Sequence, residues 1–154
     1  ITEGTPSQNG IDAVEFKVAG HAGVVPQALH KVASGGELAR ISLALSVITS
    51  AANPVPTLIF DEVDSGIGGA VAEVVGRLLA QIGSNRQVLC VTHLAQVAAQ
   101  GSHHWRVSKA TVDGVTHSTI EVLDKPQRVD EIARMLGGVT ITEATREHAL
   151  EMLG

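Results

Sequence analysis

The chain has 154 residues, of which 44% are hydrophobic and 18% charged, so it suits one domain with a hydrophobic core and is not intrinsically disordered. A formal net charge of −5 argues against broad nonspecific DNA binding by this chain alone, because such binding needs a basic surface. The single Cys90 excludes an internal disulfide and fits a reducing compartment, and no apolar run approaches the roughly 20 residues of a membrane helix.

The first third of the chain contains one strong helix signal. Residues 1–12 are mostly polar and turn-forming, so we predict a flexible N-terminal segment there and place the domain itself at 13–154. Hydrophobic residues alternate with others over 14–18, which predicts a half-buried strand. After a loop, an apolar helix is expected over 35–52, and Asn53-Pro54 ends it.

The middle of the chain alternates short apolar runs with helical patterns. The runs at 57–60 and 87–93 are typical of strands covered on both faces. A helical pattern over 70–82 lies between them, and a short helix is expected after the second strand. This alternation predicts an α/β layered domain in which the two strands are parallel.

The last third combines a hairpin signal with two helices. Strand-forming residues flank Asp113-Gly114 within 105–123, which predicts an antiparallel hairpin. Helical patterns follow at 129–136 and 142–153. The expected fold class is therefore α/β, with a mostly parallel sheet flanked by helices plus one antiparallel hairpin.

The motif Ser34-Gly35-Gly36-Glu37 stands directly before the first long helix. Ser-x-x-Glu before an apolar run is a capping box, in which both side chains bind free backbone N–H groups. A cap does not require two glycines, and each glycine costs about 0.5–1 kcal/mol relative to alanine in a helix. Without Cβ atoms, the N–H groups at the positive helix end are open to a phosphate. The residues alone leave both interpretations open.

Two adjacent carboxylates, Asp61 and Glu62, follow the first buried strand. Ligands of α/β sheets bind at the carboxyl ends of the strands. Strand alternation predicts that the two side chains point in different directions, so that one can hold a hydrated Mg²⁺ while the other faces a reacting water. A solvated acidic turn is the alternative.

His93 ends the second strand, and Asp64 begins a glycine-rich loop. The imidazole could touch a phosphate oxygen, or it could be an ordinary surface or capping residue. Cys90-x-x-His93 resembles a pair of metal ligands, but we do not expect zinc because the chain has no second cysteine. The loop after Asp64 is either a plain turn or a segment at a subunit contact.

The order of these motifs resembles the C-terminal half of an ABC-type ATPase head. Four motifs match in sequence: the signature motif at 33–37, Walker B at 57–62, the D-loop at Val63-Asp64 and the switch histidine at His93. The letters "DEVD" are similar to the SMC-like heads of chromosome-maintenance and repair ATPases, whereas transporters usually carry Asp-Glu-Pro. Over about 14–153 the chain looks like the C-terminal part of one bacterial DNA repair protein of that branch.

The resemblance implies a role for each residue of the Walker B and switch motifs. Glu62 would polarise the water that attacks ATP, and Asp61 would hold Mg²⁺ through water. His93 would steady the γ-phosphate.

The resemblance also implies a second head. That head would offer its Ser34, Gly35, Gly36 and Glu37 to the γ-phosphate, and Asp64 would link the two ATP sites across the dimer. ATP would join the heads and its hydrolysis would release them, in the repair of DNA double-strand breaks by recombination.

The P-loop, Gly-x-x-x-x-Gly-Lys-Ser/Thr, is the motif that this sequence lacks. The chain has four lysines, none of which follows such glycines: Lys17, Lys31, Lys109 and Lys125. By resemblance, the P-loop comes from an N-terminal lobe that precedes a long coiled-coil arm. We therefore expect a C-terminal head lobe that is active only within the full-length protein. Its expected partners are that lobe, a second head and DNA, with no membrane, in the cytoplasm at the nucleoid.

Two other functions stay open at this point. The chain could be the nucleotide-binding half of another ABC protein, such as a transporter, although Val63 and the Gly-Ile-Gly-Gly turn argue against that. It could also be an interaction module that binds no nucleotide, although the Asp61-Glu62 pair argues against that.

Overall fold

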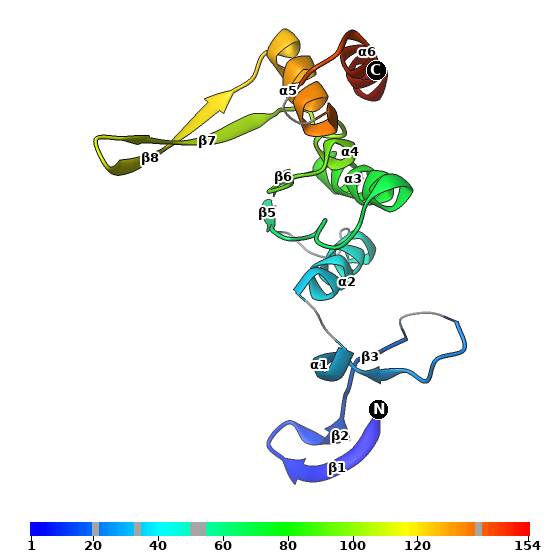
Figure 1. The fold of residues 1–154 in the computed structure, drawn as a ribbon. Helices are drawn as coiled ribbons and strands as arrows, with labels where there is room; N and C mark the ends of the chain where they lie inside the picture. The colour runs from blue at the N-terminus through cyan, green and yellow to red at the C-terminus, as the bar shows by residue number, and fades with distance from the viewer. Residues whose placement is uncertain (20–21, 33–34, 50–54, 138–139) are drawn as a thin grey trace.

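The computed structural model describes residues 1–19, 22–32, 35–49, 55–137 and 140–154 (Figure 1). It alternates small sheets and helices along an elongated body, with the N-terminal hairpin at one end and the last two helices at the other. The elements are β1 Thr2–Ser7, β2 Gly10–Ala13, β3 Lys17–Val18, β4 Gln27–Ala28, α1 Leu29–Val32, α2 Gly35–Ile48, β5 Thr57–Phe60, α3 Gly69–Gly83, β6 Gln87–Cys90, α4 Ala95–Ala98, β7 Trp105–Val112, β8 Val115–Val122, α5 Lys125–Gly137 and α6 Glu143–Leu153.

The centre of the molecule is the unit β5–α3–β6. The two strands pair in parallel, from Thr57 opposite Gln87 to Phe60 opposite Cys90, and α3 connects them. This confirms the predicted parallel arrangement, although the described parallel sheet has only two strands. The other three strand pairs are antiparallel.

The main core lies between α2, α3 and the parallel strands. One stripe of α3 is buried, because its apolar residues recur at helical spacing. The cluster consists of Leu43, Phe60, Val63, Ala72, Val75, Leu79, Ile82 and Val97. Val63 lies between Glu62 and Asp64 and is fully buried, so the core itself anchors the segment that carries these two carboxylates.

A second core joins α4, α5 and α6, with Ile132, Ala133 and Ala149 completely buried. The guanidinium of Arg128 on α5 donates to the carbonyl oxygens that end α4, at 3.0 Å from that of Ala99. Since α4 begins two residues after His93, this contact fixes the helix that follows the loop after β6. The elements predicted at 129–136 and 142–153 are therefore present, within α5 and α6.

The predicted hairpin is confirmed as β7 and β8, with Val112 opposite Val115. Asp113 and Gly114 both have positive φ, 52° and 78°, which is the backbone of a type I′ turn. The hairpin projects from the body (Figure 1), and almost all of its residues are exposed.

The N-terminal residues form short strands. Most of residues 1–12, for which a flexible segment stays a prediction, fall in the antiparallel pair β1 and β2, which the sequence did not indicate. The Ser7 hydroxyl donates to the carbonyl of Gly10 at 3.0 Å and closes the turn, a local effect that hydrophobic patterning does not reveal. The strand expected over 14–18 is reduced to Lys17–Val18, and Phe16 is 68% exposed rather than half-buried.

In the parts of the chain that the structure describes, no helix combines the length and the apolar character needed to cross a bilayer.

Candidate functional site

The carboxyl ends of β5 and β6 form a shallow pocket of about 260 Å³. Because the strands are parallel and paired in register, the residues that follow each strand meet at the same edge. The lining residues are Asp61, Glu62, Asp64, Ser65, Val91, Thr92 and His93. The structure therefore brings together the two carboxylates and the histidine that the sequence places after separate strands.

Asp61 and Glu62 line the same pocket, and the different directions that we expect of their side chains stay a prediction. Strand geometry ends at Phe60, and the alternation of side chains ends with it. Glu62 has a φ of 57°, in the left-handed region, and its carbonyl accepts from the N–H of Ser65 at 3.0 Å. The segment after β5 therefore makes a tight turn at Glu62, at the edge of the pocket.

One oxygen of Asp61 is already engaged, because its Oδ1 accepts from the backbone N–H of Glu62 at 3.0 Å. Both carboxylates are exposed, so each has oxygen atoms that water or a cation can reach. In the described ranges, no three His, Cys, Asp or Glu side chains are grouped closely enough to hold a metal ion. A Mg²⁺ ion at Asp61 would thus take its other ligands from water or phosphate, which is how Mg²⁺ is usually held.

Asp64 is held within its own chain. Its side chain is only 3% exposed and its carboxylate is bonded to residues after β6, while the link across two heads that we expect of it stays a prediction. Its Oδ2 accepts from the hydroxyl of Thr92 and from the N–H of His93. Ser65, Gly66 and Gly68 of this loop are exposed, so another molecule can reach the loop at these residues.

Cys90 does not act as a thiolate beside these groups at neutral pH. Partial burial raises the pKa of its thiol to about 11, and the negative charges of Asp64 and Asp61 add to the effect.

The signature-like motif stands on a different element from the pocket. Gly35 and Gly36 begin α2, and Glu37 lies in its first turn. Ser34 falls outside the described residues, so the structure does not decide between a helix cap and a phosphate site.

Two residues near the site were missed by sequence reasoning. Arg40 on α2 donates from Nη1 to the carbonyl of Ser65 at 2.7 Å, which ties α2 to the turn after Glu62. Thr92 bonds Asp64, as described above. No local pattern indicates the partner of Arg40, whereas the position of Thr92 directly before His93 could have indicated a supporting role.

Comparison with known proteins places these features in a family context. The chain is 52% identical over 148 residues to the DNA repair protein RecN of Xylella fastidiosa, a match that covers 96% of this chain and 27% of that protein. It is 53% identical over 147 residues to RecN of Haemophilus influenzae, covering 96% of this chain and 26% of that protein. The chain thus spans about a quarter of the length of the curated relatives it matches. No protein-family model matches the chain.

A solved structure supports the fold. In work on the ATP-driven dimerization and DNA-stimulated activation of SMC ATPases, one chain matches with a TM-score of 0.52 and 21% identity, covering 77% of this chain and 71% of that one. At this identity the match shows the fold alone. The chain is therefore similar in sequence to about a quarter of RecN, and its α/β fold is similar to that of a chain from SMC ATPases.

Proposed function

We propose that this RecN-like chain is the C-terminal half of an ATPase head that acts in DNA double-strand break repair, and that it hydrolyses ATP only together with an N-terminal lobe. The observation that carries the proposal is the pocket at the ends of β5 and β6, where Asp61, Glu62 and His93 meet. Its position at the carboxyl edge of a parallel sheet is the usual place for a nucleotide in α/β folds.

Within this pocket, Glu62 acts as the general base for the attacking water. Its exposed carboxylate can accept a proton, and the turn fixed by Ser65 orients its backbone. Asp61 would hold the hydrated Mg²⁺ through its second carboxylate oxygen, because Oδ1 accepts from the N–H of Glu62. When bound, ATP would supply the phosphoryl group, and Mg²⁺ would neutralise the negative charge of the phosphates.

His93 faces the pocket from the second strand and contacts the γ-phosphate. Its side chain is 71% exposed, so the ring is accessible to a ligand. A histidine that donates a hydrogen bond to a phosphoryl oxygen stabilises the negative charge there during transfer.

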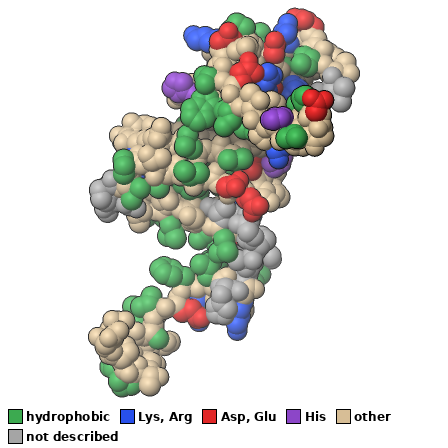
Figure 2. Space-filling view, turned by 90° about the vertical axis from the view of Figure 1, so that its left-hand side faces the viewer, with side chains coloured by type: hydrophobic (Ala, Val, Ile, Leu, Met, Phe, Trp, Pro, Cys, Tyr) green, Lys and Arg blue, Asp and Glu red, His purple; other side chains and the backbone are tan. Residues whose placement is uncertain are grey.

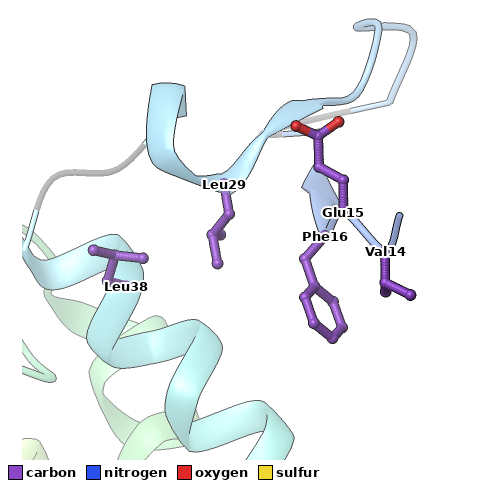
Figure 3. Close-up of a pocket in the computed structure, with 5 residues that line it drawn as sticks. All are labelled: Val14, Glu15, Phe16, Leu29 and Leu38. Carbon is purple, nitrogen blue, oxygen red and sulfur yellow. The ribbon is translucent and has the colours of Figure 1, made fainter. Parts of the chain in front are cut away.

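The missing lobe has a place to bind. Figure 2 shows hydrophobic side chains exposed over one face of the body. A pocket of about 450 Å³ lies between the segment before β3 and α2, lined by Val14, Glu15, Phe16, Leu29 and Leu38. Figure 3 shows that Phe16 and Leu29 point into this space while the carboxylate of Glu15 points away from it. Exposed apolar surface of this kind marks an interface, and the remaining three quarters of a RecN-length chain supplies the occupant.

A second head completes the site. The N-terminus of α2 carries two glycines, so its backbone N–H groups are open to a phosphate bound on a partner head. ATP therefore joins two heads and hydrolysis separates them. The net charge of −5 argues against nonspecific DNA binding by this chain alone, so we assign DNA binding to the full-length protein.

The experiment is Glu62→Gln in the complete protein. The change keeps the size of the side chain but removes the base, so hydrolysis should fall about 10²–10⁴-fold while ATP binding persists. Light scattering after size exclusion should then show joined heads that accumulate with ATP. Glu73→Gln is the matched control, because Glu73 is an exposed carboxylate on α3 that pairs with Arg77. Normal turnover by Glu62→Gln, or heads that stay separate in ATP, would contradict the proposal.

A further inference from the structure

Asp64 is a buried carboxylate beside an exposed site. The residue is 2% exposed, whereas Asp61 and Glu62 on the same segment are exposed. A buried charge is costly unless hydrogen bonds compensate for the lost water. The contacts of Asp64 are therefore expected to be specific ones.

The printed contacts of its carboxylate involve the residues that follow β6. The Oδ2 atom of Asp64 accepts from the Thr92 hydroxyl and, at 3.1 Å, from the backbone N–H of His93. The Thr92 oxygen in turn accepts from the N–H of Leu94 at 3.0 Å. A single carboxylate oxygen thus fixes the path of the chain between β6 and α4.

The same oxygen also faces the imidazole. Nδ1 of His93 lies 3.4 Å from Oδ2 of Asp64. Since Nε2 is on the opposite side of the ring, a ring that turns Nδ1 toward Asp64 leaves Nε2 for a ligand. The other charged or titratable groups near this position are Asp61 and Glu62, which line the pocket, and Cys90 on β6.

We propose that Asp64 is a positioning residue for His93: through one oxygen it holds the loop after β6 and turns the ring so that Nε2 faces the phosphate. The proposal rests on the proposed ATPase function and concerns the contacts of Asp64 within its own chain. It makes the turn after β5 and the loop after β6 one unit, so that the base and the histidine keep a fixed separation.

The main test is a double-mutant cycle in the complete protein. Asp64→Ala removes the acceptor, and a misplaced His93 should lower kcat for ATP about 10–100-fold with little change in KM. If Asp64 acts through His93, the double variant Asp64→Ala/His93→Ala should be no slower than His93→Ala alone. A further loss in the double variant, additive with the first, would overturn the proposal.

Conservative variants separate positioning from simple destabilisation. Asp64→Asn keeps an oxygen where Oδ2 lies, so it should restore most of the kcat that Asp64→Ala loses. Thr92→Val should lower kcat several-fold, whereas Thr92→Ser should not. Asp130→Asn is the control, because Asp130 is an exposed carboxylate paired with Arg146 on a different part of the chain. Equal kcat for Thr92→Val and Thr92→Ser, or an Asp64→Asn variant as slow as Asp64→Ala, would contradict the proposal even if Asp64→Ala fails to fold.

The two proposals can fail separately. If Glu62→Gln hydrolyses ATP normally, the proposed function is wrong and the role of Asp64 in hydrolysis is wrong with it. If Glu62→Gln is inactive but the Asp64 and His93 effects are additive, only the positioning role is wrong.

Discussion

Glu62 adopts a left-handed backbone conformation that residues other than glycine rarely take. A left-handed residue of this type costs about 1–2 kcal/mol, and Glu62, with a φ of 57°, is one of two non-glycine residues in the described ranges that show it. Glycine would fit the turn with less strain, so the turn alone does not explain a glutamate. Strained residues concentrate at functional sites, which agrees with the base that we assign to Glu62.

At the residue scale, the sequence indicates which side chains matter better than it indicates their contacts. Asp61-Glu62 follow β5 and His93 lies shortly after β6. Because parallel strands have their carboxyl ends at the same edge of a sheet, the sequence alone predicts that these groups meet there. The burial of Asp64 could not be predicted, because its partners Thr92 and His93 are 28 and 29 positions away. Contacts of this range depend on how two loops pack, and no local pattern encodes them.

Ser34 allows a test that separates a helix cap from a phosphate contact. Aspartate and asparagine cap helices about as well as serine, so both Ser34→Asn and Ser34→Asp should leave the melting temperature nearly unchanged. If Ser34 meets the γ-phosphate of a partner head, only Ser34→Asp places a negative charge against it. In the complete protein we expect Ser34→Asp to abolish ATP-dependent joining of heads, measured by light scattering on the samples used for melting. Normal joining would identify the motif as an ordinary cap.

At the scale of elements, strong local signals predict the structure and weak ones do not. The hairpin follows from Asp113-Gly114, because a type I′ turn needs positive φ at both positions. The pair β1–β2 was missed because its strands are polar, and only Gly4 among their residues is even partly buried. Periodicity reports burial, so a strand that buries nothing leaves no periodic signal.

The contact between α3 and α4 predicts an unusual response to alanine. Gly76 is buried, and a Cβ atom there would lie 3.1 Å from the carbonyl oxygen of Gln96 and 2.8 Å from Cγ of Gln100. Helix propensity favours Gly76→Ala by about 1 kcal/mol, but overpacking typically costs 1–3 kcal/mol, so we expect a net loss of stability of about 1 kcal/mol. Denaturant unfolding of the chain measures this change.

Gly83→Ala is the matched control, at the C-terminal end of the same helix. The nearest atoms to its added Cβ belong to Val88, at 4.0 Å, which is ordinary contact. Its stability should be unchanged or slightly higher. If Gly76→Ala is as stable as Gly83→Ala, the close approach of α3 and α4 does not constrain position 76.

At the scale of the whole molecule, the sequence overestimates burial. The apolar runs were expected to be covered on both faces, yet Ile59 in β5 is 70% exposed and Val91 after β6 is 63% exposed. Apolar residues in a sequence can be buried either within their own chain or against another part of the protein. This chain spans about a quarter of its relatives' length. If the proposed lobe packs on this chain, exposed apolar residues such as Ile59 and Val91 are the positions that it would cover.

The same reasoning predicts the behaviour of the chain on its own. It carries the base, the Mg²⁺ carboxylate and the histidine that we propose, but no P-loop to hold the β- and γ-phosphates. A ligand that binds the folded state raises stability by RT ln(1 + [L]/Kd), about 2.7 kcal/mol at one hundred times Kd. We therefore expect the purified chain to hydrolyse ATP at background rates and to melt at the same temperature with and without millimolar Mg²⁺–ATP, whereas the complete protein should melt higher with the nucleotide. Turnover by the isolated chain that Glu62→Gln abolishes would mean that this segment holds a whole active site, and the division of the site between two lobes would be wrong.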